Sequence, residues 1–173
     1  TMACYLVDGG SSKDWRHTKN FMWNDPEGFS LLLNKLALAV GKHLQAQIDA
    51  GATAVQLFDT WAGALSNDDY ERFALPAVQQ VFSMVSGAPT LYFSRDTSCF
   101  MEHYHKTGAN AFAIDWRTPI AKARRILGDV PVQGNLDPIA LQAPASEIRR
   151  KVHQIIQEAG PTGHIFNLGH GCT

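Results

Sequence analysis

The histidine with the clearest opportunity for chemistry lies near the end of the chain, between two glycines. A short apolar run, 164–168, is followed at once by Gly169, His170 and Gly171. The flanking glycines have no side chains to pack against the imidazole, which can gain or lose a proton near neutral pH. In proteins with parallel strands, functional groups gather where the strands end, because the loops there vary while the strands hold the core. His170 is therefore the first candidate for a catalytic or binding role.

Polar side chains follow four other short apolar runs. These are Asp59 and Thr60, Ser94 to Asp96, Asp115, and Gln133 to Asn135. Such groups behind apolar strands are typical of the rim of a ligand site. Structural roles stay open, because aspartate is a favoured helix cap and both Asp59 and Asp115 precede helical segments. Arg95 can equally pair with Asp96, and 135–138 is typical of a turn.

Five apolar runs bounded by turn residues predict the buried parallel strands that position these groups. The runs are 54–58, 90–93, 111–114, 130–133 and 164–168. Capping residues and apolar spacing predict helices at 2–7, 15–23, 25–51 and 118–127. Two further helices are predicted to begin at Ser66, with a kink at Pro76, and at Ser146. A glycine suited to a left-handed helix end comes before each strand: Gly51, Gly87, Gly108, Gly128 and Gly160. This pattern predicts repeated βα units in a single domain over residues 1–173.

Charge and cysteine content narrow the class of protein. Fifteen Lys and Arg stand against sixteen Asp and Glu in 173 residues, which argues against a nucleic-acid or membrane-surface partner. Three cysteines without metal-ligand spacing are expected to be reduced thiols in a cytoplasmic protein. No apolar stretch is long enough to span a bilayer. The sequence has no glycine-rich phosphate loop, so neither a metal nor an organic cofactor is expected.

Five segments resemble, in order and spacing, the uroporphyrinogen decarboxylase family. They are 3–12, 57–63, 114–116, 133–138 and 167–171. The resemblance extends over essentially the whole chain and implies an α/β fold that is part of a (β/α)8 TIM barrel. It implies that the five strands are the fourth to eighth of the barrel, with the amino-terminal strands and the last helix outside this chain.

The resemblance also implies a function and a set of site residues. The family removes carbon dioxide, without a cofactor, from the four acetate arms of uroporphyrinogen III to give coproporphyrinogen III in haem biosynthesis, usually as a homodimer. By position, Tyr5 and His170 resemble groups that bind substrate and act as donors in catalysis. Thr60 resembles a residue that contacts a substrate carboxylate, and Phe58 an apolar residue that faces the macrocycle. On the sequence alone, without the family resemblance, the phenol of Tyr5 can either reach a ligand or pack in the core.

Two features of the family have no counterpart in this chain: an arginine-rich motif that binds propionates and an aspartate beneath the pyrrole nitrogens. We therefore expect the chain alone to bind porphyrinogen weakly and not to turn it over. One alternative is a non-catalytic half-barrel or dimerising module. A more remote one is a corrinoid-dependent methyltransferase of the same superfamily, which holds zinc through a His-x-Cys pair at a strand end. Residues 92–95 supply neither ligand at that place.

Overall fold

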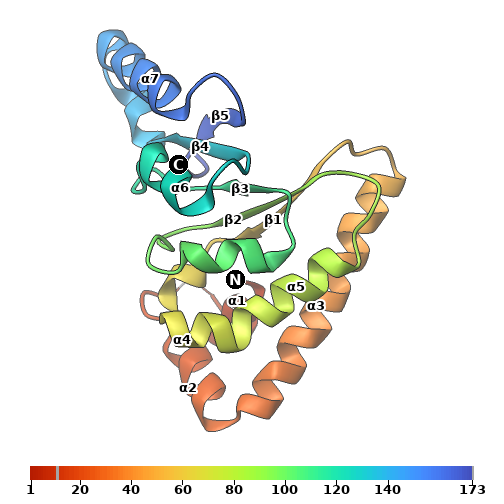
Figure 1. Cartoon of the computed structure of the whole chain (residues 1–173). Helices are drawn as coiled ribbons and strands as arrows, with labels where there is room; N and C mark the ends of the chain where they lie inside the picture. The colour runs from red at the N-terminus through yellow and green to blue at the C-terminus, as the bar shows by residue number, and fades with distance from the viewer. Residues whose placement is uncertain (11, 173) are drawn as a thin grey trace.

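A single sheet of five parallel strands organises the protein, whose computed structural model describes residues 1–10 and 12–172. The strands are β1 (Val55–Asp59), β2 (Thr90–Ser94), β3 (Ala111–Ala113), β4 (Val132–Leu136) and β5 (His164–Leu168). Each pairs with the next one along the chain (Figure 1). Successive parallel neighbours joined by helical connections are the arrangement of a (β/α)8 barrel wall, and all five predicted strands are confirmed.

The helices also follow the sequence patterns. Those before the sheet are α1 (Met2–Asp8), α2 (Arg16–Asn24) and α3 (Pro26–Asp49). Between strands come α4 (Asn67–Asp69), η2 (Tyr70–Ala74), α5 (Leu75–Ser83), α6 (Ile120–Leu127) and α7 (Ala145–Ala159), with 3-10 turns η1 (Ala62–Ala64), η3 (Met101–Thr107) and η4 (Pro138–Gln142). α3 begins where predicted because the Asp25 side chain accepts a hydrogen bond from the Gly28 amide at 2.9 Å. The predicted kink is a π-helical turn, η2, just ahead of Pro76.

Two apolar clusters fix the helices against the sheet. The larger one joins β2, β3 and β4 to α5, η3 and α6, with Tyr92, Phe112 and Val132 almost completely buried. The second joins α3, β1 and α5 through residues such as Ala37, Leu44 and Val81. Figure 1 shows α3 and α5 as neighbouring helices, with α6 and α7 toward the β4–β5 end of the sheet. The sheet body is therefore held by burial, while the strand ends remain available for other roles.

The turn predicted at 135–138 is wrong in its first half. β4 begins two residues later than expected and continues through Asn135 and Leu136, both of which are buried. The turn starts only at Asp137, whose side chain accepts a hydrogen bond from the Ile139 amide at 3.0 Å. Asn135 stays in the strand because its side-chain amide has backbone carbonyls to bond on the neighbouring loop, as described below.

The prediction that β5 is a buried strand is also wrong. β5 pairs only with β4 among the described residues, and its Ile165 and Phe166 side chains are 46% and 43% exposed. At the other edge of the sheet, Phe58 of β1 is 61% exposed. Apolar strands flanked on one side only cannot bury both faces. This chain thus exposes apolar strand edges and faces. None of the described helices has the length and apolar character to cross a bilayer.

Candidate functional site at the strand ends

The end of β1 separates two kinds of side chain. Successive residues of a strand point to opposite faces, so Phe58 and Asp59 point apart. The Asp59 carboxylate accepts hydrogen bonds from the Thr1 hydroxyl at 2.8 Å and from the Tyr92 hydroxyl at 3.4 Å. The Thr1 hydroxyl in turn accepts one from the Trp61 amide at 2.9 Å. Asp59 therefore anchors α1 to the end of β1, and the alternative that it caps a helix is wrong.

Burial and hydrogen bonding set the ionisation of the groups behind this strand end. Burial, followed by the nearby Asp59 charge, raises the pKa of Tyr92 well above its ordinary value. Burial likewise raises the pKa of Tyr104 to about 12. These phenols stay protonated near neutral pH and serve as fixed hydrogen-bond donors.

Tyr5 lies beside the segment that contains Thr60. Its ring packs edge-on against Trp61 at 6.4 Å between centroids, and against Trp15 at 5.7 Å. The anchoring of α1 therefore brings Tyr5 next to Trp61, the residue that directly follows Thr60 in the chain. Tyr5 is 46% exposed, and no described neighbour is recorded as a hydrogen-bond partner of its hydroxyl. The phenol is thus placed to meet a ligand.

Phe58 and His170 come together through an aromatic residue that the sequence reasoning did not select. Phe93 of β2 lies 5.7 Å from Phe58 and 6.1 Å from His170 between ring centroids. The His170 ring also lies 6.3 Å from Trp116, in an edge-on arrangement. His170 is partly exposed, whereas Phe93 is buried. The row Phe58, Phe93, His170 and Trp116, here named the aromatic row, thus ends at β1 on one side and at the loop after β3 on the other.

Asp115 joins the loops after β2, β3 and β4. The side chain is 3% exposed and accepts hydrogen bonds from the backbone amides of Asp96 at 2.6 Å and Arg117 at 2.9 Å. The Asn135 side-chain amide donates to the carbonyl of Asp115 at 2.8 Å and to that of Thr118 at 2.5 Å. Asp115 does not cap a helix, which corrects the second capping alternative. A carboxylate with two backbone donors is instead a fixed joint between loops.

Two glycines bring the loops after β1 and β5 into the same network. A Cβ atom at Gly63 would collide with the backbone of Arg95 and Asp96, in the loop after β2. A Cβ atom at Gly169 would collide with the backbone nitrogen of Trp116, in the loop after β3. Both positions need glycine because backbone approaches backbone. Contacts therefore link the loop after β1 to the loop after β2, the loop after β2 to the loop after β3, and the loop after β3 to β4 and to the loop after β5. The loops after the five strands are together called the rim below.

Two arginines on the rim share one carboxylate. The ion pair predicted between Arg95 and Asp96 is present, with Nε 3.3 Å from Oδ2. Arg117 approaches the other oxygen of Asp96, with Nη1 2.9 Å from Oδ1. Each guanidinium also lies over a tryptophan ring: Arg95 over Trp61 at 4.5 Å and Arg117 over Trp116 at 4.2 Å. Cation–π stacking fixes the planes of both guanidinium groups.

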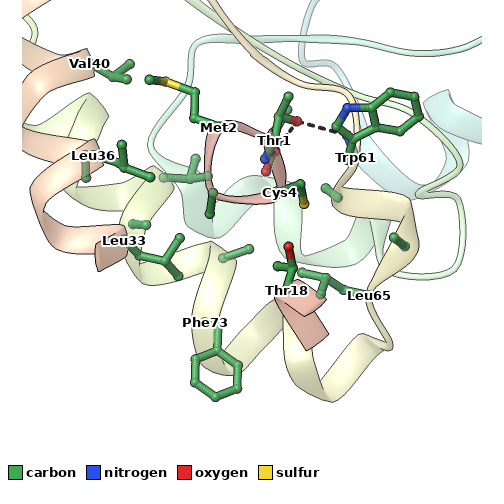
Figure 2. A pocket seen from close by; sticks show the side chains of 18 of the residues that line it. Thr1, Met2, Cys4, Thr18, Leu33, Leu36, Val40, Trp61, Leu65 and Phe73 are labelled. Carbon is green, nitrogen blue, oxygen red and sulfur yellow. Dashed lines mark hydrogen bonds and ion pairs between the residues drawn. The ribbon is translucent and has the colours of Figure 1, made fainter. Parts of the chain in front are cut away.

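The main cavity does not coincide with the predicted site residues. Figure 2 shows it beside α1 and α3, lined by side chains such as Leu33 and Leu36 of α3 and Phe73 near the end of the π-helical turn. Its volume is ≈ 140 Å³. Of the four predicted residues only Phe58 lines it, and Lys19 is the one basic side chain in its described lining. Such an apolar cavity suits hydrophobic side chains better than a ligand with many carboxylates.

Sequence reasoning missed the aromatic residues that contact the predicted site residues on the rim. Trp61, Phe93 and Trp116 each stand at the end of a predicted strand or directly behind it, which was the available signal. In the described part of the chain, no three His, Cys, Asp or Glu side chains are grouped closely enough to hold a metal ion.

Comparisons with known proteins agree on one family. The model of the family described as uroporphyrinogen decarboxylase (URO-D) matches residues 1–173. Proteins named uroporphyrinogen decarboxylase from Sorangium cellulosum and Hahella chejuensis are 46% and 45% identical to this chain over 99% and 100% of it. These alignments cover 50% and 51% of the two relatives, so the chain spans about half their length.

Among solved structures, a methyltransferase from Methanosarcina mazei matches with a TM-score of 0.68 and 18% sequence identity. The match covers 77% of this chain and 41% of that one. At this identity the likeness concerns the fold alone, and it agrees with a partial (β/α)8 barrel.

Proposed function

Because this chain belongs to the uroporphyrinogen decarboxylase family, we propose that it forms part of an enzyme that decarboxylates uroporphyrinogen III. The enzyme removes the carboxyl groups of the four acetate arms, giving coproporphyrinogen III. The substrate-binding residues of this part are Tyr5, Phe58, Thr60 and His170. The enzyme is cytoplasmic, works as a homodimer and uses no metal or organic cofactor.

The observation that supports this proposal most is the aromatic row with His170 in it. Phe58 is a large apolar side chain at a strand end and is 61% exposed, which makes it a candidate contact for an apolar ligand. Through Phe93 it leads to the partly exposed imidazole of His170. An exposed aromatic side chain connected to a partly exposed imidazole suits a ligand with an apolar macrocycle and carboxylate arms.

The reaction gives each group a role. The bond between the acetate methylene and its carboxyl carbon breaks, carbon dioxide leaves, and the electron pair remains on the pyrrole side until a proton converts the methylene to a methyl group. Proton donors near the reacting arm lower the barrier by stabilising this charge. The exposed phenol of Tyr5 and the imidazole of His170 are the donors, and the Thr60 hydroxyl binds a carboxylate.

Binding of uroporphyrin III, the stable oxidised form of the substrate, tests the proposal with this 173-residue chain. His170→Ala is expected to weaken binding about tenfold, since a hydrogen bond to a charged group contributes about 1.5 kcal/mol or more. The measurement is a titration of porphyrin fluorescence with the protein. His153→Ala is the matched control, because His153 is exposed on α7, away from the rim.

Two results would contradict the proposed site. One is equal affinity of the two histidine variants for uroporphyrin III, and the other is no binding to the parent chain at any soluble concentration. A parallel assay with uroporphyrinogen III checks the expectation that this chain alone does not turn it over. Release of carbon dioxide by the pure chain would show that residues 1–173 are sufficient for catalysis.

A further inference from the structure

Two rim arginines stand one aromatic ring away from the proposed substrate-binding groups. Arg95 lies on Trp61, which also packs against Trp15 and Tyr5. Arg117 lies on Trp116, whose other neighbour is His170. Their side chains are 23% and 51% exposed. A guanidinium stacked on a ring keeps its N–H groups in one plane and directed sideways, which is the geometry that a carboxylate accepts.

One of the two carboxylates around these arginines can be exchanged for another. Asp96 lies close to both guanidinium groups, and its side chain is 39% exposed. Asp115 also carries a negative charge, but it accepts hydrogen bonds from two backbone amides and lies 3.9 Å from Arg117. In addition, the buried Nε of Arg95 has no hydrogen-bond partner among the described residues, so its contact with Asp96 is an ion pair without a hydrogen bond. Two cations are therefore faced by two carboxylates, and only that of Asp96 is both part-exposed and close to both guanidinium groups.

The backbone of Asp96 is held independently of its carboxylate. Its amide donates to Asp115 at 2.6 Å, and Gly63 packs directly against its backbone. Its φ of 60° lies in the left-handed region, which aspartate and asparagine tolerate better than most residues. The Asp96 side chain can thus leave the two arginines while the loop stays in place.

We propose that Arg95 and Arg117 form a carboxylate-binding site on the rim, where a carboxylate arm of the substrate takes the place of the Asp96 side chain. The inference rests on the proposed function, since it assigns this site to the same polycarboxylate ligand. Asp96 holds the two guanidinium groups in position in the free protein and competes with the ligand for them. The substrate is thereby selected for carboxylates at its periphery as well as at the reacting arm.

Two charge changes at this site should act in opposite directions. Arg117→Gln removes a ligand contact and is expected to weaken uroporphyrin III binding about tenfold at low salt. Asp96→Asn removes the internal competitor but keeps a side chain that suits the left-handed backbone, and it is expected to tighten binding about threefold. Both effects should shrink as ionic strength rises.

The titration of porphyrin fluorescence serves as the readout, with thermal unfolding of each variant as the check on folding. Arg150→Gln is the matched control, because Arg150 is an exposed arginine paired with Glu147 on α7. If the cluster only clamps the loops, Asp96→Asn and Arg117→Gln will both weaken binding, and the proposal is wrong. Equal affinity of the Arg117→Gln and Arg150→Gln variants would also overturn it.

The outcomes separate this inference from the proposed function. A parent chain that binds uroporphyrin III and responds to His170→Ala, but not to the rim charges, contradicts the inference alone. A parent chain that does not bind uroporphyrin III contradicts both. Should Arg95→Gln disturb the packing of Trp61, the more exposed Arg117 still provides the test.

Discussion

Replacing Gly169 with alanine is expected to destabilise the protein by about 2–3 kcal/mol and to weaken uroporphyrin binding. The added methyl group would overlap the backbone nitrogen of Trp116, and backbone cannot move aside as a flexible side chain can. Relief of the clash must shift the loop after β5, which contains His170, or the loop after β3, which contains Trp116. The free energy of unfolding from urea titration measures the first effect, and porphyrin fluorescence measures the second.

The same substitution two residues later provides the control. A Cβ atom at Gly171 would meet nothing within 4 Å, so Gly171→Ala should leave the free energy of unfolding within about 0.5 kcal/mol of the parent. Both variants add one methyl group beside His170. If they unfold at the same urea concentration, the close contact between the loops after β3 and β5 is not present in solution.

A second large effect is expected from Asn135→Ala, at about 2–4 kcal/mol of lost stability. The Asn135 amide group donates to the carbonyls of Asp115 and Thr118, and the substitution removes both bonds. The Asp115 carbonyl then keeps only the 3.3 Å hydrogen bond from the Thr118 amide among the described residues. The loop after β3 should loosen as a result, because Asp115 also bonds the loop after β2. Urea unfolding measures the loss, and faster amide hydrogen exchange at residues 115–118 locates it.

Asn167→Ala is the matched change on the neighbouring strand. Asn167 pairs in register with Asn135, but its side chain is exposed and accepts only from the adjacent Leu168 amide. Its replacement should cost about 0.5 kcal/mol or less. Similar losses for the two asparagine variants would mean that the buried amide does not connect the loops.

Local sequence signals were sufficient for the elements of this fold. Apolar runs of four or five residues marked the strands, and Asp25-Pro26 marked the start of α3 because capping depends on neighbours in the chain. The boundary of β4 was misplaced because its cause is not local. Asn135 favours a turn by its type, and only the carbonyls of a loop some twenty residues earlier hold it in a strand.

His170 and Thr60 were candidates from their places behind apolar runs, and the resemblance to a family supplied the roles of all four predicted site residues, whereas their connections came from the structure. Nothing in the sequence indicates that Phe93 stands between Phe58 and His170, since contacts between strands depend on register. Asp59 and Asp115 could equally be caps or site groups until their partners were known. Both turned out to hold other segments in place, a role that depends on tertiary distance and leaves no pattern in the sequence.

The contacts among the rim loops have a consequence for protein engineering. Barrel enzymes are usually redesigned by exchanging one loop at a time, on the assumption that each loop varies independently of the others. Here Gly63 is pressed against the loop after β2, and Gly169 against the loop after β3. A loop taken from another protein would therefore have to be introduced together with the loop that it contacts. In this protein, loops should be exchanged in pairs.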